Sequence, residues 1–205
     1  LIDKNVSIRR FAEDIYFGKD SVMICATNNA RVAYNKVIRQ AIGKTDKIDS
    51  DQLIAVNNSS EYDNGEIFVG DDMIYIKSRT VNIPGVGNVD IDIYKQGEIT
   101  FLHVPNLMTA SLHTLQFKDL DIATKIDLFG KENIHIATGI VKNVVITTWA
   151  YAVSCHKMQG SQCETVYVDF DYCSSNWNAS RWLYTGITRA SKKVILLPSK
   201  NINFI

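Results

Sequence analysis

The residues best suited to chemistry lie between two apolar stretches, at positions 151–162. Hydroxyl, imidazole, amine, amide and glycine groups are crowded together there: Ser154, His156, Lys157, Gln159, Gly160 and Gln162. A small hydroxyl and the backbone N–H groups of a turn can donate hydrogen bonds to phosphate oxygens, and Gly160 would let the main chain approach a ligand closely. The alternative is that His156 and Lys157 are solvated loop residues, and the residue types alone leave both readings open.

A second candidate, Arg189, lies near the end of a stretch with helical periodicity, residues 179–190, and precedes an apolar run. An arginine near the C-terminus of a helix usually donates to the last carbonyl groups and offsets the helix dipole. The alternative is an arginine finger, whose planar guanidinium stabilises the charge on a phosphoryl group during its transfer.

Other signals for chemistry are weak. The triplet Gly43-Lys44-Thr45 resembles the end of a phosphate-binding loop, but that pattern needs a glycine at position 38, where Ile38 stands. The four cysteines form no CxxC pair and no ladder with histidines at metal-ligand spacing, so no metal site is predicted. They indicate a reduced, intracellular protein.

The composition is that of an ordinary globular protein: 205 residues, of which 46% are hydrophobic and 21% charged. It excludes disorder, collagen and coiled coils. Residues 1–50, 51–130 and 131–205 carry formal charges of +3, −7 and +4, so an acidic middle separates two basic ends. This asymmetry suggests that nucleic acid contacts only part of the surface. The sequence has no apolar run long enough for a membrane span and no leader, and Leu1 in place of Met suggests a fragment of a longer protein.

The elements that must position these residues follow two kinds of pattern. Near both ends, helical periodicity alternates with continuous apolar strands, which is typical of a parallel sheet covered on both faces. Helices are expected around residues 8–16, 30–41 and 179–190, and strands at 21–26, 143–150, 165–170 and 192–197. The apolar face of the second helix should include Ala30, Ala33, Tyr34, Val37 and Ile38.

The middle of the chain has a different pattern. Short apolar or alternating runs at about 52–105, separated by turn residues, predict a small antiparallel barrel, and residues 109–129 are expected to be helical. The economical architecture is one α/β domain built from residues 1–50 and 143–205, with residues 51–142 inserted as a β-barrel and its connecting segment.

Several segments closely resemble motifs of a known family. Residues 151–162 and 184–190 are similar to motifs V and VI of superfamily 1 helicases, and their H-K-x-Q-G and Y-T-x-I-T-R-A forms look like the RecD-like and Dda-like branch. Residues 25–29 are similar to the C-x-T-N segment of that branch, and residues 63–66 match the N-G-[DEQ] hairpin of its inserted SH3-like barrel. The resemblance implies a RecA-like α/β domain of the P-loop NTPase type that carries this antiparallel barrel.

The resemblance also implies a role for each candidate residue. Arg189 would be catalytic, as the arginine finger. The nucleotide-binding residues would be Gln159, Gly160 and Gln162, and the nucleic-acid-binding residues would be Thr27, Asn28, Ser154, His156 and Lys157. Asn28 could instead be a simple helix N-cap. Tyr75 and Tyr94 of the barrel are candidates for stacking on bases, with core or strand-surface positions as the alternative.

The implied function is the second motor domain of an ATP-dependent DNA helicase that moves 5′ to 3′ along single-stranded DNA, in replication, repair or recombination. Its partners would be single-stranded DNA, ATP with Mg²⁺, and the first RecA-like domain of the same protein, with no membrane, inside a cell or in the host cytoplasm of a virus or phage. The Walker A and B motifs, absent from these residues, would belong to that first domain, so the fragment alone should be inactive. The alternatives are a viral replicase-type RNA helicase domain and a non-catalytic nucleic-acid-binding remnant.

Overall fold

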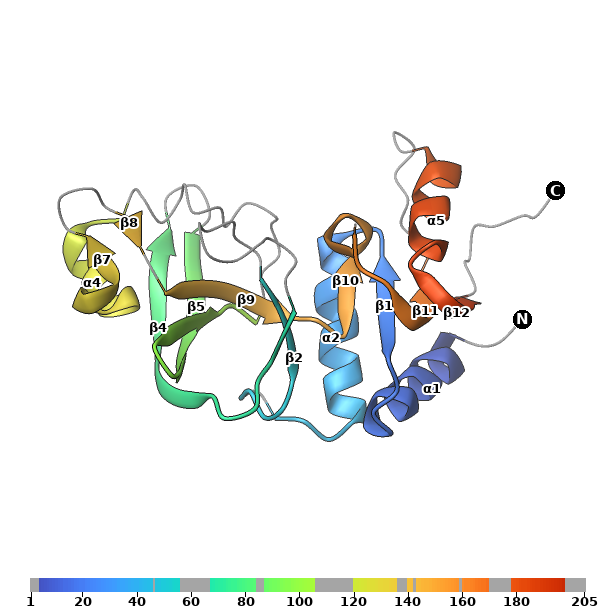
Figure 1. Cartoon of the computed structure of the whole chain (residues 1–205), viewed down its shortest axis with the longest axis horizontal. Helices are drawn as coiled ribbons and strands as arrows, with labels where there is room; N and C mark the ends of the chain where they lie inside the picture. The colour runs from blue at the N-terminus through green and yellow to red at the C-terminus, as the bar shows by residue number, and fades with distance from the viewer. Residues whose placement is uncertain are drawn as a thin grey trace. The chain divides into compact units, whose positions relative to one another are not determined.

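The computed structural model of the chain describes residues 4–45, 47–55, 67–83, 87–105, 120–135, 140–141, 143–158, 160–169 and 178–197. The chain divides into two compact units (Figure 1). Unit 1 comprises Leu1–Lys47 and Ala150–Ile205, and unit 2 comprises Ile48–Trp149. Each unit has its own sheet and core, so each is described by itself.

Unit 1 contains a four-stranded parallel sheet in the order β10-β1-β11-β12. Its strands are Ala152–Ser154 (β10), Ser21–Cys25 (β1), Cys163–Val168 (β11) and Ala190–Leu196 (β12). Every residue of β1 is buried, because side chains alternate between two faces that are both covered. A mixed α/β unit with a parallel sheet is compatible with the RecA-like domain expected from the sequence.

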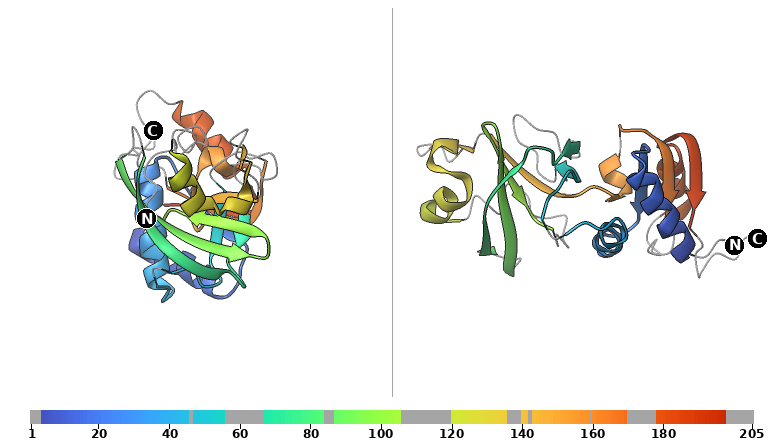
Figure 2. Two further views of the ribbon diagram at one scale, coloured as in Figure 1. Left: turned by 90° about the vertical axis from the view of Figure 1, so that its left-hand side faces the viewer. Right: turned by 90° about the horizontal axis from the view of Figure 1, so that it is seen from below.

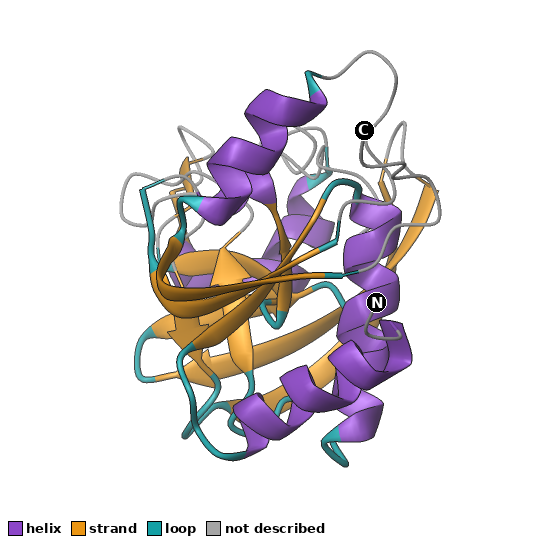
Figure 3. Cartoon of the chain, turned by 90° about the vertical axis from the view of Figure 1, so that its right-hand side faces the viewer, coloured by secondary structure: helices purple, strands orange, loops and turns teal. Residues whose placement is uncertain are grey.

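Helices lie on both sides of this sheet (Figure 3). Helices α1 (Lys4–Tyr16) and α2 (Asn28–Ala41) cover one face. The cluster that they form with the strands includes Phe11, Met23, Tyr34, Ile38 and Tyr167. The burial of these side chains between helix and sheet is the main hydrophobic stabilisation of this face.

Helix α5 (Ala179–Ile187) covers the opposite face and contacts a short 3₁₀ helix, η2 (Cys155–Met158). Ile24 and Val168 belong to this face because they alternate with Met23 and Tyr167 along their strands. Their methyl carbons lie 3.8 Å from the position that a Cβ at Gly186 would take. Gly186 therefore brings the backbone of α5 close to the sheet.

The buried face of α2 differs from the expected one. Ala33 and Val37 were expected in its apolar stripe but are exposed, whereas Arg31, Asn35 and Arg39 are buried. These three polar residues follow the i, i+4, i+8 spacing of one helix face. Arg31 Nε donates to Asn28 Oδ1 (3.4 Å), and Arg39 Nη2 donates to Lys47 O (3.0 Å). Hydrogen bonding has overridden the apolar pattern, because buried polar groups with partners cost far less than unsatisfied ones.

Asn35 holds the short edge strand β10 in place. Its Nδ2 donates to Ala152 O (2.8 Å), and its Oδ1 accepts from Ala152 N (2.9 Å). On the other side of β10, Met23 N donates to Tyr151 O (3.0 Å). The amide side chain of Asn35, which is 1% exposed, thus supplies β10 with the donor and the acceptor that a neighbouring strand would otherwise supply.

Asp14 anchors α1 to the sheet. Its carboxylate accepts hydrogen bonds from the Tyr167 hydroxyl (2.6 Å) and from Lys19 Nζ (2.7 Å). Burial alone would raise the pKa of Asp14, but these hydrogen bonds outweigh burial and lower it. The anchor therefore needs Asp14 ionised, and it weakens only in acid.

Unit 2 is built on a six-stranded sheet in the order β3-β2-β9-β6-β5-β4. Its strands are Gln52–Ala55 (β2), Ile67–Val69 (β3), Ile74–Ile83 (β4), Gly87–Gln96 (β5), Ile99–His103 (β6) and Val144–Trp149 (β9). Strands β4 and β5 form a long antiparallel ribbon, green in Figure 2. The core on this sheet includes Ile91, Leu102, Phe129 and Ile146.

The arrangement of unit 2 corrects two expectations. The sheet is open within the described residues, where its outer strands β3 and β4 do not pair with each other, so the closed antiparallel barrel is not seen. The run at 143–150, expected in the α/β domain, supplies β9, which pairs in parallel with β6, and unit 1 resumes at Ala150. A continuous apolar run has the same pattern in any buried strand, which is why its sheet could not be assigned. Residues 63–66 and 109–119 lie outside the described residues.

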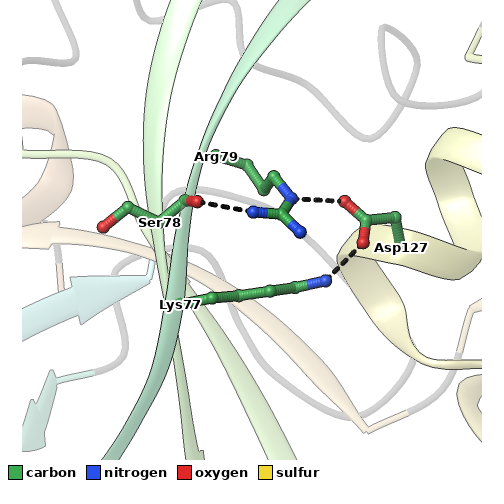
Figure 4. Close-up of polar contacts among 4 residues, drawn as sticks. All are labelled: Lys77, Ser78, Arg79 and Asp127. Carbon is green, nitrogen blue, oxygen red and sulfur yellow. Dashed lines mark hydrogen bonds and ion pairs between the residues drawn. The ribbon is translucent and has the colours of Figure 1, made fainter.

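Helix α4 (Ile122–Phe129) is joined to strand β4 through Asp127. The Asp127 carboxylate accepts hydrogen bonds from Lys77 Nζ and from Arg79 Nε, the latter at 2.8 Å (Figure 4). These bonds hold the pKa of Asp127 below its usual range. A 3₁₀ turn, η1 (Lys131–Asn133), and a two-stranded sheet of Ile134–His135 (β7) and Ile140–Val141 (β8) complete the described part of this unit.

Replacing Asn35 with Ala should destabilise unit 1 by about 2–4 kcal/mol, since the N–H and C=O groups of Ala152 would stay buried without partners, at about 1–3 kcal/mol each. Urea unfolding measures the loss, and amide hydrogen exchange at Ala152 should accelerate. The control is Asn29→Ala, an exposed asparagine of the same helix, which should change the free energy of unfolding by less than about 0.5 kcal/mol. Equal stability of the two variants would show that Asn35 does not hold β10.

Candidate nucleotide and nucleic-acid sites

One group of candidate residues gathers at the carboxyl ends of β1 and β10. The two strands are adjacent and parallel, with Cys25 paired to Ser154, so the segments that follow them leave the same edge of the sheet. Helix α2 follows β1, and η2 follows β10. This carboxyl edge carries the following residues: Thr27, Asn28, Ser154, His156 and Lys157. In open α/β sheets this is the edge where ligands bind.

Thr27, not Asn28, is the N-cap of α2. Its backbone is extended, with φ −122° and ψ 155°, and its hydroxyl oxygen accepts from Ala30 N (3.2 Å). Asn28 is the first helical residue, and its Oδ1 accepts from Arg31 Nε. The N-cap alternative for Asn28 is therefore wrong. Ser154 is half-buried, and the side chain of His156 lies outside the described part of the structure.

Arg31 belongs to this edge, although sequence analysis did not single it out. It lies in the first turn of α2, is 5% exposed, and has a pKa lowered by burial. Arg31 is not part of the apolar face predicted for this helix, so the sequence pattern did not predict that it is buried. The nearest signal was the i+3 spacing from Asn28, which lets the two side chains meet on one helix face.

Lys157 adds a second cation at the same edge. It is half-buried in η2. Burial, followed by the nearby positive charge of Arg31, lowers the pKa of Lys157 to about 8. The reading of Lys157 as a fully solvated loop residue is therefore wrong.

Of the other candidates, Gln162 and Arg189 lie at the amino ends of β11 and β12, and Gly160 lies in the connection from η2 to β11. Cys163 pairs with Ala190, and Cys163 N donates to Arg189 O (3.0 Å), so the residues just before these two strands are neighbours. Gln162 is exposed there. Gly160 has φ 91°, a conformation that favours glycine, and nothing lies within 4 Å of its Cβ direction. Gln159 lies outside the described residues.

Arg189 folds back on the helix that precedes it. Its Nε donates to Thr185 O and its Nη2 donates to Thr188 Oγ1, both at 3.2 Å. Its side chain is half-buried, and its backbone N–H donates to Gly186 O (3.2 Å). In this structure Arg189 therefore satisfies the C-terminal end of α5, which is the first of the two roles considered for it.

The two groups of candidates lie on opposite edges of one sheet. Strand β11 has six residues, and a rise of about 3.3 Å per residue separates its ends by roughly 15–20 Å. A ligand the size of one phosphate group therefore cannot touch both Arg189 and Ser154, which lie at the amino ends and the carboxyl ends of the strands. The candidate residues of unit 1 therefore fall into two groups, which the connection from η2 to β11 joins.

Residues 149–197 match the UvrD-like helicase C-terminal domain. The matched segment begins just before β10 and ends with β12, so it contains the candidate residues of η2 and the amino edge, including Arg189. The match supports a superfamily 1 helicase C-terminal region, as the motif resemblance indicated. It covers about a quarter of the chain, and no curated protein matches the sequence.

The described residues contain no group of three or more His, Cys, Asp or Glu side chains that could hold a metal ion. At the amino edge, the Asp20 carboxylate accepts a hydrogen bond from Glu164 N (3.0 Å). The guanidinium of Arg189 at this edge has the chemistry of a donor to phosphate oxygens. Among the described helices, none is long and apolar enough to cross a membrane.

The ε-amino group of Lys157 should titrate near pH 8 instead of near its ordinary value of 10.5. Amine acetylation as a function of pH, quantified at Lys157 by mass spectrometry, measures this pKa. Arg31→Gln should move the pKa upward, because it removes the nearby positive charge, whereas Lys36→Gln, an exposed lysine of the same helix, should leave it unchanged. A titration near 10 in the unsubstituted chain would mean that Lys157 is solvated.

Proposed function

We propose that unit 1 is the second RecA-like motor domain of an ATP-dependent DNA helicase of the RecD-like and Dda-like branch. The observation that supports this proposal is the placement of Thr27 and Ser154 at the carboxyl ends, and of Arg189 at the amino end, of strands in one parallel sheet. A motor that moves along a strand must hold nucleotide and nucleic acid at the same time and couple them through a rigid element. The UvrD-like match over residues 149–197 supports the same reading.

At the amino edge, Arg189 would act as an arginine finger on a nucleotide that another RecA-like domain binds through its Walker motifs and Mg²⁺. Bound ATP supplies the phosphoryl group whose hydrolysis drives the cycle. Gln159, Gly160 and Gln162 would adjoin the same nucleotide. Turning the guanidinium outward would break the bonds from Arg189 to Thr185 and Thr188, at a cost of about 1–3 kcal/mol. Closure of the cleft between the domains would replace these bonds with stronger ones to phosphate oxygens.

At the carboxyl edge, the strand backbone would be held by Thr27, Asn28, Ser154, His156 and Lys157. Helix α2 begins here, and the N–H groups of a helix N-terminus favour phosphate. The grip on the strand would tighten and relax as nucleotide is bound and hydrolysed at the other edge, moving the domain 5′ to 3′. Strand β1, which is buried at every residue, and the buried carboxyl half of β11 would form the rigid element that transmits that change.

Unit 2 would be the inserted module, related to the SH3-like barrel of this branch. Unit 1 contains fifteen Lys and Arg against eight Asp and Glu, and unit 2 contains seven against fourteen, giving formal charges of +7 and −7. The net positive charge of unit 1 would therefore attract a nucleic-acid strand, whereas the net negative charge of unit 2 would repel it. Tyr75, 44% exposed on β4, suits stacking on a base. Tyr94 is 1% exposed and its hydroxyl accepts from Ile48 N (3.1 Å), so it is a core residue.

Arg189→Ala should lower strand-stimulated ATP turnover by about 10³-fold or more in the protein that includes the nucleotide-binding domain, because the finger acts only on the transition state. Steady-state hydrolysis measures turnover, and fluorescence anisotropy should find strand affinity nearly unchanged. Arg181→Ala removes an exposed arginine from the same helix and should be silent in both assays. Unchanged turnover in Arg189→Ala would remove the finger assignment.

The 205-residue chain alone should hydrolyse no ATP, since it lacks the Walker lysine and metal ligands. Turnover that survives purification and is lost in Arg189→Ala would refute the proposed division of labour. Unwinding of matched DNA and RNA duplexes by the longer protein tests the DNA assignment. Preference for RNA would favour a replicase-type RNA helicase, and strand binding without turnover would favour a non-catalytic remnant.

A further inference from the structure

Asp169 is a buried carboxylate to which neither the motif resemblance nor the family match assigns a role. It directly follows β11 and is 1% exposed. Ile24 of β1 pairs with Val168 of β11, and Asp169 N donates to Ile24 O (2.8 Å). Asp169 therefore lies beside Cys25, at the carboxyl edge of the sheet from which α2 begins.

The carboxylate of Asp169 faces the start of α2. Its Oδ2 accepts a hydrogen bond from the hydroxyl of Tyr34 (2.5 Å), which lies in the second turn of that helix and is 7% exposed. Helical side chains point back toward the N-terminus, so the Tyr34 hydroxyl and the carboxylate that it meets lie close to the first turn. A phosphate bound at that N-terminus would be on the order of 10 Å from Asp169.

The charge of Asp169 reaches the backbone that leads into α2. Burial raises the pKa of the Cys25 thiol to about 12, and the nearby Arg31 lowers this pKa whereas Asp169 raises it. The Cys25 sulfur lies 3.7 Å from the carbonyl oxygen of Thr27, which is the N-cap of the helix. Asp169 and Arg31 therefore act with opposite sign on one place, directly behind the N-cap.

A carboxylate in this place opposes the binding of phosphate. The N–H groups and the dipole of a helix N-terminus favour any nearby anion, and Asp169 is such an anion within the protein. It also repels a second negative charge. A neutral amide could accept the hydrogen bond from Tyr34 equally well, so that bond alone does not require a carboxylate. A motor that moves along a strand must release it in every cycle, and weaker affinity appears mainly as faster release.

We propose that Asp169 limits the affinity of unit 1 for a single nucleic-acid strand by placing a negative charge behind the N-terminus of α2. The inference rests on the proposed function, because it needs a strand phosphate at the carboxyl edge. It gives that edge a residue that weakens binding and speeds release, and Tyr34 holds the carboxylate in place.

The test is fluorescence anisotropy of a labelled oligothymidylate with the 205-residue chain at low salt. Asp169→Asn removes the charge and keeps an acceptor for Tyr34, and it should tighten binding roughly three- to tenfold. A unit charge about 10 Å away changes affinity by roughly four- to fifteenfold at an effective dielectric constant of about 40 to 20, and salt screens part of this effect. Stopped-flow dissociation should show most of the gain as slower release of the strand.

Two controls separate charge from structure. Tyr34→Phe removes the hydrogen bond and keeps the charge, so it should not tighten binding. Glu13→Gln removes an exposed negative charge from the last turn of α1, which leads to the amino end of β1, and should change affinity by less than about twofold. Damage to the fold weakens binding, so tightening in Asp169→Asn alone cannot come from a purely structural role.

Each outcome decides between the two claims. Strand binding by the unsubstituted chain that Asp169→Asn leaves unchanged or weakens would overturn the limit on affinity and leave the proposed function standing. Equal tightening in Asp169→Asn and Glu13→Gln would mean that only net charge matters and would also overturn it. Failure of both the unsubstituted chain and Asp169→Asn to bind any strand would count against the proposed function and the inference together.

Thermal unfolding shows whether unit 1 remains folded in each variant. Asp169→Ser is neutral and smaller and can also accept from Tyr34, so it takes the place of Asp169→Asn if that variant does not fold. A carboxylate that the fold itself requires needs no second role. Unfolding of both neutral variants would therefore overturn the inference.

Discussion

The carboxyl edge of unit 1 depends on the two hydrogen bonds between Asn35 and Ala152. Strand β10 has only three residues and lies at the edge of its sheet, so its pairing with β1 supplies few backbone hydrogen bonds. Asn35 completes that pairing from the helix side. The position of η2 relative to the first turn of α2 depends on this connection.

One face of α2 performs three tasks at successive turns. Arg31 donates to Asn28 at the carboxyl edge, Asn35 holds β10, and Arg39 donates to the backbone at Lys47, where unit 1 gives way to unit 2. A helix with apolar residues in these positions would bury more hydrocarbon. It would not fix the register of the edge strand, because packing contacts are less directional than hydrogen bonds.

Much of unit 1 could be predicted from the sequence, because its patterns are local. Continuous apolar runs correctly predicted the strands β1, β11 and β12, and helical periodicity correctly predicted the helices α2 and α5. The sequence could not show that the run at 144–149 pairs with β6, because an apolar run has the same pattern in any buried strand. The burial of Arg31 could not be predicted either, because it depends on contacts that are made only after folding. For Arg189, the sequence offered two roles, and only the structure showed its bonds to the end of α5.

The bonds from Arg189 to Thr185 and Thr188 define a resting state for this side chain. Two such bonds on a half-buried group are worth together about 1–3 kcal/mol, so a released guanidinium would be populated at between roughly 15% and 1%. An anion that binds only the released form would have its apparent affinity reduced by that fraction. Side chains exchange such conformers within nanoseconds to microseconds. Release of the guanidinium would therefore lower the affinity for an anion without limiting the rate of ATP hydrolysis. Every anion that binds the released Arg189 would therefore meet the same energetic threshold, which the end of α5 sets.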